Sequence, residues 1–315
     1  MRKTAIDMVH TLAKNDERVV FIGSDLSPGL LEDMKAEMPR RHYMEGVTEA
    51  NVIGMAAGMA MDGFVPYVNT IATFITRRCY EQVALDLCLH DLPVRMIGNG
   101  GGLVYAPLGP THLAVEDISI MRSLPNMTVV AVSDSEEMVR LMDASLDWPH
   151  PIYIRLGKGG EPVISKQENG FEIGKGITLR ESARAHPVVL ISTGVMTARV
   201  LDAADILAQK GIETEVLHLH TLKPLDDALI LERVPRASCF CTIEEHSVIG
   251  GLGSAVVDTL VNAGVTKLPP MRRLGIPDKF VDSYGSQDDL LERFGMLPAQ
   301  IASTVGELAE GELVG

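Results

Sequence analysis

Glu49 is an acidic residue at the start of an expected helix, in the segment GVTEANVIGMAAGMAMDG of residues 46–63. The same helix carries Gly54 and Gly58 on one face, where small residues let another backbone approach closely. A carboxylate in this position can exchange a proton with a bound ligand. It can also do no more than stabilise the positive end of the helix dipole, and for Glu49 taken alone that interpretation is the better one.

The next segments add aromatic, basic and imidazole side chains. Phe74, Arg77 and Tyr80 stand at helical spacing in VNTIATFITRRCYEQVALD, residues 68–86, where they could line one pocket or be core aromatics and a solvated charge. His112 lies in the glycine-rich loop GNGGGLVYAPLGPTHLAVEDI, residues 98–118. An imidazole there can polarise an oxygen or relay a proton, or can simply precede a helix without a task. The glycine run does not complete G-x-G-x-x-G, so it is a weak nucleotide-binding signal.

The elements that must position these residues are short apolar strands alternating with amphipathic helices, a pattern typical of a parallel sheet covered on both faces. Strands are expected at Arg18–Gly23, Pro66–Asn69, Pro93–Gly98, Met127–Val132 and Ile152–Arg155, and helices at Thr4–Ala13, Glu49–Met61, Arg77–Leu89 and Ser135–Leu146. Asp25, in FIGSDLSPG, would lie at the carboxyl end of the first strand, the usual ligand side of such a sheet. A turn or helix-cap aspartate is the alternative.

A second series of elements follows a polar, glycine-containing stretch that begins SKQENG at residue 165. Its strands are expected at Pro187–Ser192, Glu213–His218 and Ser238–Ile243, and its helices at Met196–Gln209 and Leu252–Ala263. We therefore predict an α/β fold of two tandem three-layer αβα domains with mainly parallel sheets. The predicted domains are residues 1–164 and 183–315, joined by a linker at 165–182.

The composition limits the classes of partner. With 315 residues, 46% of them hydrophobic, the chain can bury two cores, and its formal net charge of -14 disfavours nucleic acid and acidic membrane surfaces. No secretory leader or apolar run of membrane-spanning length is present, so we expect a cytoplasmic protein. The cysteines have no C-x-x-C spacing and are expected to be reduced, buried thiols: Cys79, Cys88, Cys239 and Cys241.

These segments resemble the pyrimidine-binding and C-terminal domains of the transketolase group of thiamine-diphosphate enzymes. Residues 46–63 are similar to the helix that carries the family's catalytic glutamate, and residues 68–86 to the TF-x-x-R-x-x-Y pattern of the deoxyxylulose-phosphate synthase branch. GPTHLAVEDI, residues 109–118, is similar to D-G-x-T-H-Q-x-x-E-D. FIGSDLSPG and CTIEEHSVIGGLGSAVVD, residues 241–258, also match family segments, the second with a structural task, so His246 is given no catalytic role.

The resemblance implies a role for each candidate residue. Glu49 would be catalytic, hydrogen-bonding N1′ of the aminopyrimidine ring, and His112 would be the second catalytic residue, acting at the substrate oxygens. The ring would stack on Phe74. The cofactor-binding residues implied are Glu49, Phe74, Arg77, Tyr80 and Asp25, and the substrate-contacting residues are His112 and Arg155.

The resemblance also implies a partner chain. Family members hold the diphosphate and its Mg²⁺ through a G-D-G motif followed by an asparagine, and these 315 residues contain no G-D-G. Mg²⁺ would therefore be bound mainly by a separate N-terminal transketolase-type subunit, and no metal ligands are assigned here. Because the family's two halves face each other across subunits, we expect a heterotetramer with two copies of each chain (α2β2).

Three positions depart from the family pattern in the substrate region. Leu108 stands in place of the aspartate before G-x-T-H, Gly100 in place of a phosphate-contacting histidine, and Gly29 in place of an acceptor-phosphate serine. A pocket without these polar groups should discriminate differently among sugar phosphates. The identity of the ketose and aldehyde is therefore left open.

The expected function is transfer of a two-carbon ketol unit from a ketose to an aldehyde acceptor, by a subunit that is active with its partner. One alternative is decarboxylation of a 2-oxoacid, as in 1-deoxyxylulose-5-phosphate synthases or the β subunits of 2-oxoacid dehydrogenases. The other is a non-catalytic subunit that stabilises the partner.

Overall fold

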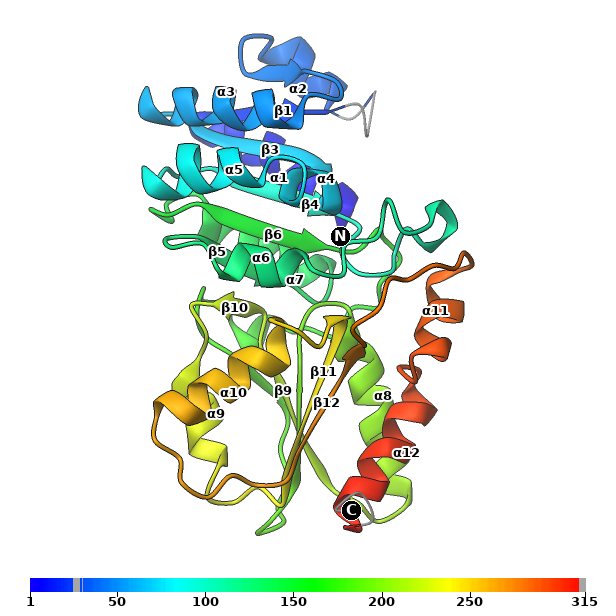
Figure 1. Ribbon diagram of the computed structural model, residues 1–315. Coiled ribbons are helices and arrows are strands. Elements are labelled where there is room, and N and C mark those ends of the chain that lie inside the picture. The colour runs from blue at the N-terminus through cyan, green and yellow to red at the C-terminus, as the bar shows by residue number, and fades with distance from the viewer. Residues whose placement is uncertain (25–28, 30, 312–315) are drawn as a thin grey trace.

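The computed structural model describes residues 1–24, 29 and 31–311. Its helices and strands form two α/β domains, which lie one above the other in Figure 1. The first sheet has seven strands in the order β10-β5-β6-β4-β3-β1-β2. Its strands are β1 (Val19–Gly23), β2 (His42–Met44), β3 (Val65–Ile71), β4 (Arg95–Asn99), β5 (Thr128–Ala131), β6 (Ile152–Leu156) and β10 (Thr221–Lys223). All pairs are parallel except β10 with β5.

Helices cover both faces of the first sheet, because successive strand residues point to opposite sides and both sets are apolar. On one face Phe21, Tyr67 and Ile97 pack with helices α1 and α7, and on the other Ile22, Val68 and Met96 pack with α3 and its neighbours. The helices are α1 (Arg2–Asn15), α2 (Glu32–Glu37), α3 (Glu49–Met61), α4 (Ala72–Thr76), α5 (Tyr80–Gln82), a π-helix (Val83–Leu89), a 3₁₀ turn (Ala106–Leu108), α6 (Asp117–Arg122) and α7 (Ser135–Ser145).

The second sheet has five strands in the order β12-β11-β8-β9-β7, parallel except for β7 with β9. Helices α8 and α12 cover one face, and α9 and α10 the other (Figure 1). The strands are β7 (Ile177–Arg180), β8 (Val188–Ser192), β9 (Thr214–His218), β11 (Cys239–Ser247) and β12 (Met271–Ile276). The helices are a 3₁₀ turn (Gln167–Asn169), α8 (Met196–Gln209), α9 (Asp227–Arg233), α10 (Leu252–Asn262), α11 (Gln287–Arg293) and α12 (Pro298–Ala309).

The predicted fold of two tandem αβα layers with mainly parallel sheets is confirmed. Four strands lie where the sequence pattern does not predict them: β2, β7, β10 and β12. Strand β7 falls within the stretch 165–182 expected as a linker, and β10, from the second half of the chain, completes the edge of the first sheet. All four are edge strands, and β2, β7 and β10 have only three or four residues, too few to show a periodicity of their own.

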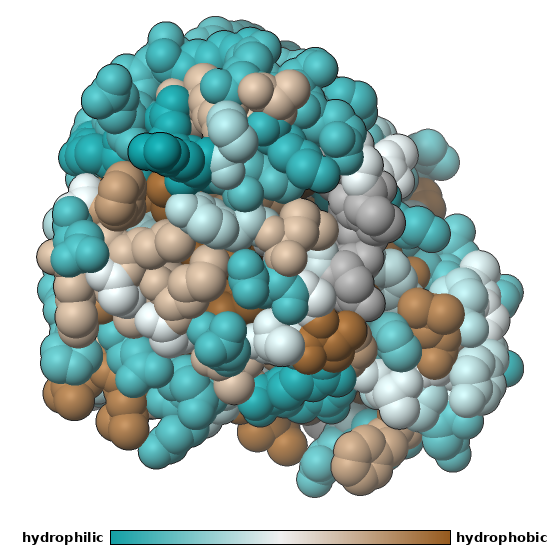
Figure 2. All heavy atoms as spheres, turned by 90° about the horizontal axis from the view of Figure 1, so that it is seen from above, coloured by the Kyte–Doolittle hydropathy of each residue, from teal (hydrophilic) through white to brown (hydrophobic). Residues whose placement is uncertain are grey.

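Seen from above, polar side chains dominate the upper part of the face in Figure 2 and apolar ones gather across its middle. The exposed apolar residues near β2 and α3 include Met44, Val47 and Met61. Among the described residues, no helix is both long and apolar enough to cross a bilayer.

All four cysteines are buried free thiols, as predicted, and burial raises the pKa of Cys79 and of Cys88 to about 12.

Candidate active site

Glu49 lies at the carboxyl edge of the first sheet, where the chain leaves β1 and β3. It begins α3, and its side chain shares a narrow pocket with Ser24, which follows β1, and with Asn69 and Thr70 near the end of β3. Glu49 is 3% exposed, and the pocket beside it leaves no space for a water molecule. A buried carboxylate needs a partner, because its desolvation is costly otherwise.

That partner is Arg78, which the sequence pattern did not single out. Its Nη1 atom donates to Glu49 Oε2 at 2.9 Å, and its guanidinium carbon lies 4.1 Å from the centre of the Phe74 ring. The Arg78 side chain is 44% exposed, so it pairs with Glu49 from the solvent side. The available signal was its position four residues after Phe74, the spacing of one helical face, although the helix itself ends at Thr76.

His112 extends this group of side chains. Its ring meets the Phe74 ring edge-on, with 5.2 Å between ring centres, and its Nδ1 atom lies 2.9 Å from Thr111 Oγ1. Glu49, Arg78, Phe74 and His112 are thus connected by successive contacts, although they come from three separate stretches of the chain. The structure brings together both residues predicted to be catalytic and the aromatic residue predicted to stack on the pyrimidine ring.

Arg77 and Tyr80 point to neighbouring elements instead of Glu49. Arg77 pairs with Glu116 at 2.9 Å, and this pair lines a cavity of about 500 Å³ that also touches Phe280 in the loop after β12. The Tyr80 hydroxyl lies 2.9 Å from Ser123 Oγ, at the end of α6. The helix is interrupted between Thr76 and Tyr80, so Arg77 and Arg78 do not continue the regular spacing assumed from the sequence.

Arg155 is buried, and the structure does not place it in the Glu49 group. Its Nε atom donates to Asp117 Oδ2 at 2.8 Å, and its Nη2 atom donates to the carbonyl oxygens of Ala114 and Glu245 at 3.1 and 2.8 Å. Burial opposes its charge, yet the Asp117 carboxylate outweighs burial and the pKa of Arg155 is raised. Arg155 joins the first sheet to β11 of the second. Asp25 lies outside the described residues.

The glycine-rich loop packs tightly instead of forming an open cradle. A Cβ atom added at Gly101 would come within 2.5 Å of the Arg155 side chain, and one at Gly102 within 2.7 Å of Glu245. Gly100 adopts a φ of +72° and abuts the Tyr105 ring. The departure at Gly100 therefore has a packing reason, since a larger residue would clash with Tyr105.

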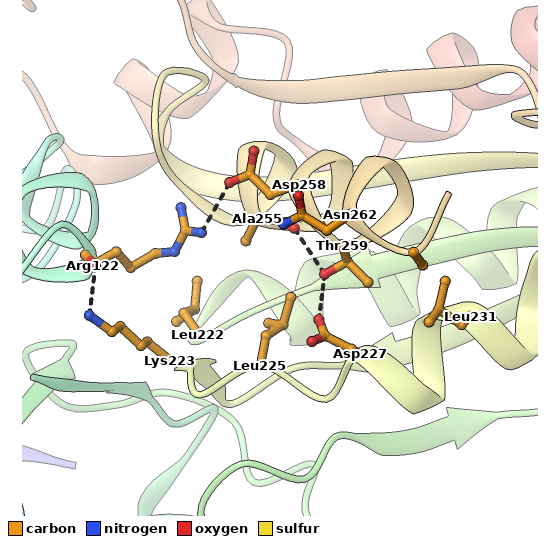
Figure 3. A pocket seen from close by; sticks show the side chains of 11 residues that line it. Arg122, Leu222, Lys223, Leu225, Asp227, Leu231, Ala255, Asp258, Thr259 and Asn262 are labelled. Carbon is orange, nitrogen blue, oxygen red and sulfur yellow. Dashed lines mark hydrogen bonds and ion pairs between the residues drawn. The ribbon is translucent and has the colours of Figure 1, made fainter. Parts of the chain in front are cut away.

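A cavity of about 540 Å³ lies in the second half of the chain, between α9 and α10 (Figure 3). No residue predicted to bind cofactor or substrate lines it. Its cations already have partners: Arg122 donates to the carbonyls of Gly250 and Gly251, and Lys223 donates to Arg122 O. The structure therefore favours the Glu49 edge of the first sheet as the candidate active site.

The chain is similar to known families and proteins along most of its length. The chain matches the models "Transketolase, pyrimidine binding domain" over residues 1–161 and "Transketolase, C-terminal domain" over residues 174–301. The 6-deoxy-6-sulfo-D-fructose transketolase subunit SqwH of Clostridium sp. is 36% identical over 311 residues, which are 98% of this chain and 94% of that protein. The 1-deoxy-D-xylulose-5-phosphate synthase of Crocosphaera subtropica is 34% identical over 303 residues, but the chain spans 46% of its length.

Solved structures of transketolases are similar to this chain as well. A split gene transketolase, described as an inactive beta4 tetramer, has a TM-score of 0.88 and 31% identity, with 98% of both chains covered. A transketolase mutant from Pichia stipitis has a TM-score of 0.82 at 18% identity, covering 98% of this chain and 46% of that one, which shows the shared fold. The resemblance inferred from the motifs is confirmed along nearly the full chain.

Proposed function

The chain belongs to the transketolase family, and from that premise we propose that it is the pyrimidine-binding subunit of a two-chain enzyme. The enzyme transfers a two-carbon ketol unit from a ketose to an aldehyde acceptor. The observation that carries this proposal is a buried carboxylate, Glu49, at the carboxyl edge of a parallel sheet, linked through Arg78 to the Phe74 ring, which in turn meets the His112 imidazole. Ligands of open α/β sheets bind at that edge.

The residues present fit the pyrimidine end of thiamine diphosphate. Glu49 offers a buried acceptor for a ring nitrogen, and Phe74 offers a face for stacking. For the diphosphate end, the sequence has no G-D-G motif, and the described residues contain no group of three or more His, Cys, Asp or Glu side chains arranged for a metal. When bound, the cofactor supplies the nucleophile and the electron sink for cleaving the bond beside a ketose carbonyl.

The chain's own residues then have distinct tasks. Glu49 holds the proton at the ring nitrogen, and Phe74 orients the ring. His112, which meets the Phe74 ring edge-on, donates or accepts a proton at the substrate oxygens. Cofactor contacts by Arg77, Tyr80 and Asp25 and a substrate contact by Arg155 remain part of the proposal. Arg77, paired with Glu116, also borders a cavity of about 500 Å³.

The partner is proposed to be an N-terminal transketolase-type subunit that carries the G-D-G motif and the Mg²⁺, in an assembly with two copies of each chain. Two relatives matched along nearly their full lengths are described as a transketolase subunit and a split gene transketolase. The exposed face of helix α3 also supports the presence of a partner subunit. The helix is apolar on most sides, yet Gly54 and Gly58 face outward and meet no backbone of this chain within 4 Å.

Replacing Glu49 by Gln tests the proposal. With the partner and thiamine diphosphate present, Glu49→Gln is expected to lower the rate of ketol transfer about 100-fold or more, because the amide cannot take up the proton. The matched control is Glu136→Gln, since Glu136 also stands in the first turn of a helix but is exposed. Unchanged turnover for Glu49→Gln would support the alternative of a non-catalytic stabilising subunit.

Decarboxylation of a 2-oxoacid is the second candidate, favoured by the likeness to 1-deoxy-D-xylulose-5-phosphate synthases. The same reconstituted pair distinguishes the two reactions. Supplied with pyruvate and an aldehyde, a synthase releases CO₂, whereas a ketol transferase does not. CO₂ release at a rate comparable to the transfer of a ketol unit would replace our proposal by this one.

A further inference from the structure

Arg78 occupies an unusual position for an exposed side chain next to a buried acid. One end of its guanidinium donates to Glu49 Oε2 at 2.9 Å, while its carbon lies 4.1 Å from the centre of the Phe74 ring. A guanidinium is planar, carries N–H donors at its edge and stacks on aromatic faces. The Arg78 side chain therefore satisfies Glu49 and covers Phe74 at the same time.

These two contacts are the ones that an aminopyrimidine ring would need here. Such a ring is also planar, also stacks on an aromatic face, and would meet Glu49 through its edge. The Arg78 guanidinium and an aminopyrimidine ring therefore cannot both occupy the position next to the Glu49 carboxylate and the Phe74 ring. The pocket on the sheet side of Glu49 leaves no space for even a water molecule, so a ring has to reach Glu49 and Phe74 from the side on which Arg78 contacts both.

Arg78 is the side chain able to move. It is 44% exposed, whereas the residues that line the pocket beside Glu49 are all buried, Val52 and Ile75 within the apolar core. Among the described residues, its other contact is with the Phe74 ring. An arginine anchored by one hydrogen bond and one ring face can turn toward solvent without disturbing the sheet.

We propose that Arg78 is a placeholder for the pyrimidine ring: it fills the ring's two contacts in the cofactor-free chain and leaves them when the cofactor binds. The inference rests on the proposed function, since it concerns the same ring. Its physical role is to keep Glu49 compensated, because a buried carboxylate without a partner is strongly destabilising. Its consequence is that the cofactor competes with an internal group, which lowers its apparent affinity.

The test is the affinity of thiamine diphosphate for the reconstituted pair, measured by calorimetric titration in the presence of Mg²⁺. Arg78→Ala removes the competitor and is expected to tighten binding about 10-fold, the effect of losing one ion pair and one stacking contact from the free state. Arg78→Lys keeps a charge near Glu49 but has no planar group. The affinity of this variant pair for thiamine diphosphate should lie between those of the unaltered pair and the Arg78→Ala pair. Arg40→Ala is the control for net charge, because Arg40 is exposed and distant in sequence from the site.

A second measurement uses this chain alone, with 4-amino-5-hydroxymethyl-2-methylpyrimidine as the probe, so that diphosphate binding plays no part. Ligand-observed NMR should detect the probe on the Arg78→Ala chain at concentrations where the unaltered chain shows none, and adding Glu49→Gln should remove that signal. Circular dichroism verifies that each variant is folded. If Arg78→Ala is unfolded, Arg78→Lys replaces it in the same measurement.

The outcomes separate this inference from the function on which it rests. If the unaltered pair binds thiamine diphosphate and Arg78→Ala binds it equally or more weakly, Arg78 assists the ring or is indifferent to it, and the placeholder role is wrong. If neither pair binds thiamine diphosphate at all, the proposed function fails and the placeholder role fails with it. Tighter binding by Arg78→Ala, with Arg40→Ala unchanged, supports both.

Discussion

Glu49 combines burial with a negative charge, two properties that oppose each other in most side chains. The carboxylate lies at the first turn of α3, where the helix dipole favours an anion, and Arg78 supplies a cation at 2.9 Å. The side chains behind it belong to a hydrogen-bonded group in which Asn99 Nδ2 donates to Asn69 Oδ1 and to the carbonyl of Thr70. The position of the acid is thus held from the sheet side and covered from the solvent side.

His112 should matter for turnover more than for cofactor affinity, because it meets Phe74 edge-on and does not contact Glu49. His112→Asn is expected to lower kcat/KM for the ketose by about 100-fold, the usual size of a general acid–base contribution. The concentration of thiamine diphosphate that gives half-maximal rate should change little. Steady-state kinetics of the reconstituted pair measures both quantities, with the exposed His90→Asn as the control. Wild-type kcat/KM in His112→Asn would remove His112 from the reaction.

Among the elements, α7 is held at both ends by buried charged side chains. At its start, Asp134 accepts hydrogen bonds from the backbone N–H groups of Glu136, Glu137, Ile164 and Ser165, so it caps the helix and ties down the chain beyond β6. Burial would raise the pKa of Asp134, but hydrogen bonds from these N–H groups outweigh it and the pKa is lowered.

At the other end of α7, the fully buried Arg95 donates to the carbonyl oxygens of Ser145 and Leu146, which have no partner within the helix. Burial lowers the pKa of Arg95 to about 10, so its charge persists at neutral pH. Helix α7 therefore keeps a fixed position against the first sheet. The strands whose carboxyl ends form the candidate site depend on this packing.

Asp134→Ala is expected to lower the free energy of unfolding by about 3 kcal/mol, because it removes a helix cap and leaves buried N–H groups without acceptors. Urea unfolding followed by circular dichroism measures the change. Ser286→Ala is the matched comparison, since Ser286 caps α11 at an exposed position by a bond from Asp289 N, and it should cost about 1 kcal/mol or less. Equal losses for the two caps would mean that burial adds nothing at Asp134.

Across the chain as a whole, the two sheets are joined by buried polar contacts as well as by an apolar core. His218, at the end of β9, lies with its Nε2 atom 2.9 Å from Glu137 Oε2 on α7, and its Nδ1 atom is 2.8 Å from Thr197 Oγ1. The neighbouring His220 is fully buried and stacks on Phe171, with 4.3 Å between ring centres. These residues lie at the junction between the halves of the chain.

The junction should weaken in acid. Burial lowers the pKa of His220 from 6.5 to about 4, so between these values the unfolded chain binds a proton that the folded chain does not, and stability falls as pH falls through that window. The shift corresponds to about 3 kcal/mol at most. The pKa of Glu137 is lowered to about 2 because the nearby His218 outweighs burial, so its contribution is lost below pH 4.5.

Thermal unfolding at several pH values checks this dependence. The unaltered chain should lose stability between pH 6.5 and 4, and His220→Gln should lose less over the same interval, because its side chain does not titrate. His186→Gln is the control, since His186 is exposed and should leave the slope unchanged. Parallel curves for the unaltered chain and His220→Gln would exclude His220 as the cause.

Much of the site's surroundings could be predicted from short stretches of sequence. The expected bounds of α3 and α8 coincide with the observed ones, and Glu49 lies in the first helical turn as predicted. Helical periodicity and end signals depend on residues within one or two turns of each other, so a local pattern is sufficient to predict them. The same holds for the central parallel strands, which are continuous apolar runs, but not for the edge strands β2 and β12, whose sequences are polar in part.

Contacts between distant segments could not be predicted in this way. Whether Arg77 or Arg78 meets Glu49 depends on the break in the helix after Thr76, and the burial of Arg155 depends on carbonyl oxygens from Ala114 and from Glu245, which is 90 residues away. The placement of β10 in the first sheet is of the same kind. Any strand edge offers the same backbone donors and acceptors, so the choice among partners is made by packing of the complete chain.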